Sequence, residues 1–191
     1  LLFFELELNR IDDAALNASM QVPALAHYRP WIENLRMEKP HQLDDRIEEL
    51  FLEKSQTGAM AFNRLFDETI AGLRFVVDGE DLALEPTLNL MVSPDEARRR
   101  AGAEALGKTF KENLRVFTLI TNTLAKDKEI SDRWRGFKDI ADARHLSNRV
   151  EPEVVAALVE STSRAYPRLS HRYYKMKAKW LGKPKLMYWD R

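Results

Sequence analysis

The chain has 191 residues, of which 45% are hydrophobic and 31% are charged, a composition typical of a folded globular domain. It contains no cysteine, which excludes disulfides, thiolate zinc sites and a cysteine nucleophile. The 30 basic and 30 acidic residues balance, but residues 1–97 hold 8 Lys/Arg against 19 Asp/Glu, whereas residues 98–191 hold 22 against 11. This asymmetry is compatible with a nucleic-acid arm, although we favour two halves that pack on each other.

The start of the chain shows no sign of a targeting segment. Leu1–Leu8 is apolar but lacks basic residues and carries Glu5 and Glu7, unlike a signal peptide. No apolar run approaches the roughly 20 residues of a membrane span. We therefore expect a cytoplasmic protein without a membrane partner. The sequence has no initiator Met, so we interpret it as a piece of a longer protein, with a shortened natural relative as the alternative.

The first elements are predicted from the spacing of apolar residues. Phe3–Asn9 alternates weakly and could be extended, whereas Asp12–Met20 indicates a short helix. The next helical stripe must be kinked or split at Pro30. Two further helices are expected on either side of Gly58. The three stripes are Leu25, Tyr28, Ile32 and Leu35; then Leu43, Ile47, Leu50 and Phe51; then Phe62, Leu65, Phe66, Ile70 and Leu73.

A change of pattern at Phe75–Leu84 indicates a small β-hairpin. Two short apolar runs flank Asp78-Gly79, and this pair tolerates the positive φ angles of a tight two-residue turn. An irregular loop is the alternative, because an isolated hairpin is only marginally stable.

The strongest helix signal is the capping box Ser93-Pro94-Asp95-Glu96, in which Ser93 would cap the helix and Pro94 would take its first position. The stripe that follows predicts a helix of about 30 residues, straight or bent, closed by Gly136. Its apolar members are Leu106, Phe110, Leu114, Phe117, Ile120 and Leu124.

The last third of the chain predicts three more helices. A short one covers roughly Asp139–Ser147, a second opens at Pro152, and a third follows Pro167 and ends at Gly182-Lys183-Pro184. The second helix should direct Val155, Leu158, Val159 and Thr162 inward, and the third has a stripe of Leu169, Tyr173, Met176 and Trp180.

The histidines give no metal motif. No two of them are four residues apart, so an H-E-x-x-H zinc site is excluded. Glu38-Lys39-Pro40-His41 matches E-x-x-H, but Pro40 breaks the helical face that a di-iron half-site needs. We expect surface or capping roles for the histidines, which are His27, His41, His145 and His171.

The basic C-terminal segment is the remaining candidate for binding. Ser161–Arg191 holds nine Lys/Arg and a single acid, Asp190, interleaved with aromatic residues. Such a mixture could track and stack on a nucleic-acid strand. A helix with a core-facing aromatic stripe and a solvated basic face explains it equally, and we favour that explanation.

Several segments are individually unspecific but occur in a familiar order. They are Leu2–Asn9, Phe117–Leu124, Arg133–Phe137, Tyr166–Leu169, Arg172–Tyr174, Lys177–Gly182 and Trp189–Arg191. In this order and spacing the sequence resembles the oligoendopeptidase F family, zinc metallopeptidases of the thimet-oligopeptidase type.

The resemblance implies a mostly helical enzyme with a deep channel for short peptides. The family's zinc is held by the two histidines of H-E-x-x-H and a later glutamate, and the zinc lowers the pKa of its water. This motif does not occur in the sequence, so the resemblance transfers no catalytic, cofactor-binding or metal residue to it.

We therefore predict an all-α fold with at most one small hairpin near Phe75–Leu84, with residues 1–191 forming a single helical, non-catalytic N-terminal region. It would line the peptide channel of a zinc metalloendopeptidase whose catalytic part lies elsewhere, binding no zinc itself. The alternatives are a helical interaction module or a nucleic-acid binder. Self-association is expected through apolar surface, notably at Tyr188 and Trp189.

Overall fold

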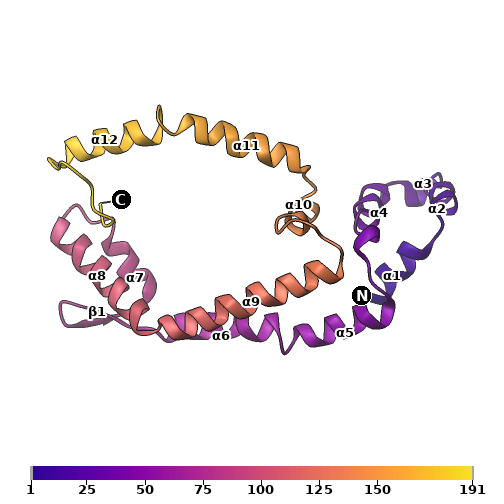
Figure 1. The fold of residues 1–191 in the computed structure, drawn as a ribbon, viewed down its shortest axis with the longest axis horizontal. Coiled ribbons are helices and arrows are strands. Elements are labelled where there is room, and N and C mark those ends of the chain that lie inside the picture. The colour runs from indigo at the N-terminus through magenta and orange to yellow at the C-terminus, as the bar shows by residue number, and fades with distance from the viewer. Residues whose placement is uncertain (1, 191) are drawn as a thin grey trace. The chain divides into compact units, whose positions relative to one another are not determined.

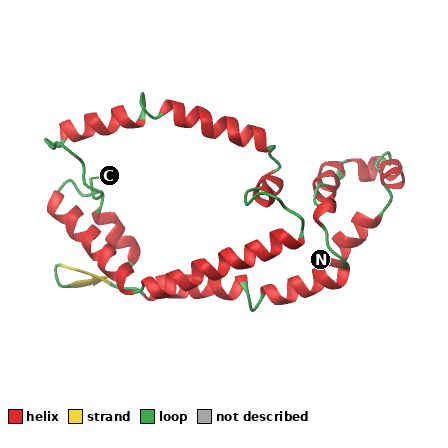
Figure 2. Ribbon diagram, viewed as in Figure 1, coloured by secondary structure: helices red, strands yellow, loops and turns green. Residues whose placement is uncertain are grey.

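The computed structural model describes residues 2–190, which are mainly helical with one small sheet (Figures 1 and 2). The predicted fold class and the position of the hairpin are both confirmed. No helix in the described part of the chain is both long and apolar enough to cross a membrane. The helices are α1 (Leu2–Arg10), α2 (Asp13–Ser19), α3 (Pro23–Ala26), α4 (Arg29–Arg36), the 3-10 helix η1 (Lys39–His41), α5 (Asp45–Ser55), α6 (Ala59–Gly72), α7 (Leu84–Leu90), α8 (Glu96–Glu112), α9 (Leu114–Trp134), α10 (Asp142–Asn148), α11 (Pro152–Ala165) and α12 (Ser170–Trp180).

The chain divides into two compact units, and each unit is assembled from two separate stretches of sequence. The first unit combines the residues up to Gly58 with Lys126–Ala156. The second combines Ala59–Ala125 with the residues from Ala157 onward. Helices α9 and α11 therefore each contribute residues to both units.

The N-terminal segment of the first unit is a helix, so the expectation that Phe3–Asn9 is extended was wrong. In α1, Leu6 and Asn9 lie one turn apart and are both buried. Arg36 satisfies carbonyls in the last turn of this helix, donating to Leu8 O at 2.9 Å and to Asn9 O at 3.2 Å. A tertiary partner 28 residues away thus favours the helix over the weak local alternation.

The short helices α2, α3 and α4 follow their sequence signals. Asp12 caps α2 by accepting hydrogen bonds from Ala14 N and Ala15 N. Pro30 lies at the start of α4, so the predicted stripe is split there, as expected. Leu16, Met20 and Ile32 form the small apolar core of this part, with Leu8 of α1 packed against it.

The hairpin of the second unit has the predicted tight turn. Strand β1 (Phe75–Val77) pairs antiparallel with β2 (Glu80–Leu82), and Phe75 is opposite Leu82. Asp78 and Gly79 have φ angles of 53° and 87°, as a type I′ turn requires. Phe75 is fully buried and Val76 is 58% exposed, so the alternation of the strand directs one face to the core.

The core of the second unit lies where α7, α8 and β1 pack together (Figure 1). Its buried apolar residues are Phe75, Val77, Met91, Ala103, Ala105, Leu106 and Trp189. Phe110 packs against them, with its ring centroid 5.5 Å from that of Phe75. The predicted stripe therefore contributes Leu106 and Phe110 to this core.

The long helix predicted after Ser93 differs at its start and in its middle. Asp95, not Ser93, is the N-cap: it accepts from Ala97 N, while Ser93 Oγ accepts from Asp95 N in the preceding turn. The helix is also interrupted at Asn113, whose Nδ2 donates to Thr109 O at 2.9 Å. Asparagine competes for backbone groups in this way, which favours a break over a continuous helix.

The two last long helices leave their predicted inward residues exposed. In α11, Leu158 is 65% and Val159 59% exposed, and in α12, Trp180 is 67% exposed. The prediction that Leu158 and Val159 point into a core was therefore wrong. The favoured explanation that the aromatic stripe of α12 faces a core was also wrong, since Tyr173 is 48% exposed as well. Periodicity defines which side chains share a stripe, but not whether a partner covers it.

Candidate functional site

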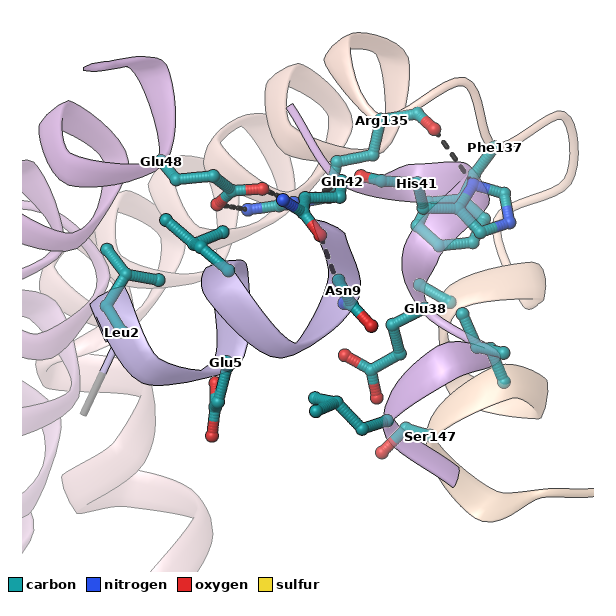
Figure 3. Close-up of a pocket in the computed structure, with 14 residues that line it drawn as sticks. Leu2, Glu5, Asn9, Glu38, His41, Gln42, Glu48, Arg135, Phe137 and Ser147 are labelled. Carbon is teal, nitrogen blue, oxygen red and sulfur yellow. Dashed lines mark hydrogen bonds and ion pairs between the residues drawn. The ribbon is translucent and has the colours of Figure 1, made fainter. Parts of the chain in front are cut away.

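A polar pocket of about 350 Å³ lies in the first unit (Figure 3). Helices α1, α4, η1 and α10 bound it, together with the first turn of α5 and the turn that follows α9. Its lining residues are Leu2, Glu5, Leu6, Asn9, Leu35, Glu38, His41, Gln42, Glu48, Arg135, Phe137, Ala143, Leu146 and Ser147.

A bidentate ion pair forms one wall of this pocket. Arg135 Nη1 and Nη2 donate to Glu48 Oε1 and Oε2 at 2.7 and 2.8 Å. Glu48 lies in the first turn of α5, where its Oε1 also accepts from Leu43 N at 2.9 Å. The hydrogen bonds from Arg135 lower the pKa of Glu48 despite its burial, and the same contacts raise the pKa of Arg135.

The local backbone explains why Arg135 reaches this position. Gly136 has a φ of 74°, and the α9 terminus closes with Phe137 N donating to Asp132 O at 2.9 Å. The prediction that Gly136 ends this helix is confirmed. Arg135 is the first residue after α9, so its side chain leaves the helix toward Glu48.

His41 connects η1 to the same turn. Its Nδ1 donates to Arg135 O at 2.9 Å, and its ring stacks on Phe137 with centroids 3.9 Å apart. Arg135 Nη1 in turn donates to His41 O at 3.2 Å. Glu38, the other end of the E-x-x-H pattern, pairs with Arg149 Nη2 at 2.7 Å through Oε1. The two residues of that pattern therefore engage separate protein partners.

Asn9 is the buried polar residue of α1 in this pocket. Its side chain lies beside Gln42, to which Nδ2 donates at 3.0 Å. The residue is only 6% exposed, yet Oδ1 receives no hydrogen bond from the described residues. Figure 3 shows this oxygen turned away from Gln42. A buried acceptor without a donor costs about 1–3 kcal/mol, so Asn9 is an unusual feature of the pocket.

A second buried charge cluster lies in the other unit and anchors its C-terminal segment. Asp190 Oδ1 accepts from Arg99 Nη2 at 2.9 Å and from Lys183 Nζ at 2.8 Å. Burial disfavours the charged carboxylate, but the hydrogen bonds from Lys183, Met187 N and Arg99 outweigh it and lower the pKa of Asp190 to about 2.

This anchor corrects the expectation that Trp189 lies on an exposed surface. Trp189 is 8% exposed and belongs to the core of the second unit, whereas Tyr188 is 60% exposed. The Arg100 guanidinium lies 5.5 Å from the centre of the Trp189 ring. Of these two residues, only Tyr188 is exposed, as predicted.

Within residues 2–190, no group of three or more His, Cys, Asp or Glu side chains is placed to hold a metal ion. His41 and His145 line one further pocket of the first unit, whereas His27 lies against Tyr28 and His171 lies near Tyr166. Sequence reasoning missed Asn9, Glu48 and Arg135. The signals were weak: a glutamate in a first helical turn, and an arginine before a helix-ending glycine.

The chain is similar in sequence to known oligopeptidases. Residues 7–75 match the family model described as Oligopeptidase F. The group B oligopeptidase PepB of Streptococcus agalactiae serotype III (strain NEM316) is 25% identical over 195 residues, which cover 98% of this chain and 32% of PepB. The chain therefore spans about a third of the length of this curated relative.

Solved structures show the same fold. The crystal structure of oligoendopeptidase-F from Enterococcus faecium superposes with a TM-score of 0.85 at 22% identity, covering 99% of this chain and 38% of that one. A candidate peptidase from Chlamydophila abortus gives a TM-score of 0.79 at 16% identity, covering 98% of this chain and 32% of that one.

Proposed function

Because the chain is homologous to the N-terminal part of oligopeptidase F and PepB, we propose that it is the helical, non-catalytic N-terminal region of a zinc metalloendopeptidase that hydrolyses short peptides. One observation carries the proposal: nearly all of this chain aligns with about a third of the length of these relatives. The described residues offer no metal cluster, so the zinc and the catalytic groups would come from sequence outside this chain.

In this role the chain, treated as a single region over residues 1–191, would form part of the wall of the peptide channel. The exposed apolar side chains of α11 and α12 support this, since such surfaces are typical of interfaces with further protein. The catalytic part of the same protein is the partner that fits them. We assign the whole protein to the cytoplasm.

The test compares two proteins made from the encoding gene. Reading the gene beyond the Arg191 codon should reach an H-E-x-x-H motif, and the longer product should cleave an internally quenched short peptide in a chelator-sensitive manner. The 191-residue chain alone should cleave nothing and hold no stoichiometric zinc. A stop codon soon after Arg191 would overturn the proposal in favour of a helical interaction module.

The nucleic-acid alternative rests on one observation, the exposed basic and aromatic surface of α12. Tyr173, Tyr174 and Trp180 are all about half exposed or more, beside Lys175 and Lys179. If this surface bound single-stranded RNA, the affinity would fall steeply with salt. We favour the peptidase proposal, and tight RNA binding with such a salt dependence would count against it.

A further inference from the structure

The polar pocket of the first unit contains an acceptor that the protein itself does not use. Asn9 is buried, its Nδ2 is engaged by Gln42, and its Oδ1 has no donor among residues 2–190. Because an unpaired buried acceptor is costly, a ligand that donates an N–H or O–H there would recover that free energy.

The charges around the pocket determine which charge that ligand should carry. Glu48 is neutralised by Arg135, and Glu38 by Arg149. Glu5 lines the same pocket from α1 and forms no ion pair with any described residue. One negative charge therefore remains, which favours a ligand with a single positive charge.

The same lining restricts the chemistry of the cation. A bare metal ion is disfavoured, because the described residues provide no cluster of three ligating side chains. Part of the wall is apolar, with Leu2, Leu6, Leu35, Phe137 and Leu146. A pocket of about 350 Å³ that combines such an apolar wall with polar side chains suits a small organic ligand.

We propose that this pocket binds the α-ammonium end of a short peptide. Asn9 Oδ1 and the Glu5 carboxylate accept hydrogen bonds from the ammonium, and the leucine-rich wall contacts the side chain of the first residue. The inference rests on the proposed function in one respect, the choice of a peptide as the source of the ammonium group.

The experiment titrates the ¹⁵N-labelled chain with leucinamide, which has an α-ammonium group, an apolar side chain and no carboxylate. We expect saturable shifts of amide signals in α1 and around Gln42, and none with N-acetyl-leucinamide, which lacks the charge. Binding should fall as the pH rises through about 8, where the α-amino group loses its proton. Equal shifts from the acetylated compound would overturn the proposal.

Charge variants of α1 supply the matched comparison. Glu5→Gln should weaken leucinamide binding by about threefold to tenfold and Glu5→Lys should abolish it, since a charge-assisted hydrogen bond is replaced by a neutral or repulsive contact. Glu7 is exposed on the same helix but does not line the pocket, so Glu7→Gln and Glu7→Lys should bind as the wild type does. Equal losses in the Glu5 and Glu7 variants would refute the site.

A third ligand identifies the source of the ammonium. Nα-acetyl-lysinamide presents a side-chain ammonium in place of an α-ammonium, and we expect it to bind at least tenfold more weakly than leucinamide. Equal binding would refute the assignment to a peptide terminus. A failure of leucinamide to bind would refute this site without touching the proposed function, which is tested by peptide cleavage in the longer protein.

Discussion

Glu48 keeps its negative charge although its side chain is 9% exposed, because two guanidinium N–H groups and one backbone N–H replace the water that it loses. Arg135 is held in turn by the His41 carbonyl and lies 5.7 Å from the centre of the Phe51 ring. The pair links the start of α5 to the end of α9, so its removal should affect the first unit as a whole.

Glu48→Gln tests this at the level of one charge. We expect the free energy of unfolding to fall by about 2 kcal/mol at pH 7, because Arg135 keeps only a neutral acceptor. Since the pKa of Glu48 is lowered on folding, this contribution is complete above the pKa of the unfolded chain and disappears as the pH falls through the folded value. Urea unfolding measures it. The exposed neighbour gives the control: Glu49→Gln should change stability by less than about 0.5 kcal/mol.

Asp190 allows a sharper pH prediction. Its pKa falls from an ordinary 3.8 to about 2 on folding, so its contribution is complete above about pH 4 and is lost between there and about pH 2. Asp190→Asn should reduce stability by roughly 3 kcal/mol at pH 6, because Arg99 is left buried beside a neutral group. The difference from the wild type should shrink at pH 2.5. A gap that is the same at both pH values, or that appears also in the exposed Asp81→Asn, would contradict the assignment.

At the scale of elements, the contact between α7 and α8 depends on a missing side chain. A Cβ at Gly102 would lie 2.9 Å from Leu90 Cβ and 3.2 Å from Thr87 O, so only glycine allows the helices to approach this closely. Gly107, in the same helix, faces open space. One helix therefore contains a glycine that the packing needs and one that it does not.

Alanine at these two positions should have opposite effects on the stability of the chain. Gly102→Ala should destabilise the chain by about 1–3 kcal/mol, since the helices must separate or strain. Gly107→Ala should stabilise it by about 0.5–1 kcal/mol, because alanine is the better helix former at an unhindered position. Thermal and urea unfolding measure both. Equal effects of the two substitutions would mean that the α7–α8 contact is looser than described.

The elements also show which local signals in the sequence were sufficient. The Asp78-Gly79 turn and the proline at the start of α4 act within two or three residues, and both were predicted correctly. The structure of α1 depends on Arg36, 26 or more residues away, and could not be read from its own alternation. Ser93 and Asp95 are both competent caps, and sequence alone does not decide between them.

The candidate site was beyond prediction for the same physical reason. Asn9, Glu48 and Arg135 come from positions up to 126 residues apart, and each is an ordinary polar residue in its own neighbourhood. Only tertiary packing buries Asn9 and pairs Glu48 with Arg135. The family resemblance, by contrast, depends on the order of segments along the chain and needs no tertiary contact.

At the scale of the whole molecule, the exposed apolar side chains should cause self-association when no catalytic part is present. Sedimentation of the 191-residue chain should show larger species with rising concentration, weakened in Leu158→Ser and Trp180→Ser, which change residues that are 65% and 67% exposed. Trp189→Ser should instead destabilise the second unit by about 3–5 kcal/mol, as expected for a core aromatic residue. A monomer at every concentration would contradict this prediction.

The interleaved composition of the two units has a consequence for synthesis on the ribosome. When Gly58 has emerged, the first unit still lacks Arg135, and Glu48 has no guanidinium to pair with. The second unit is completed later still, because Asp190, the partner of Arg99, is translated 91 residues after it. The first stretch of each unit must therefore persist without its partner stretch while the intervening residues are translated. We therefore expect the residues up to Gly58 to remain protease-sensitive until Ala156 has left the exit tunnel, and the second unit to remain so until Asp190 has left it.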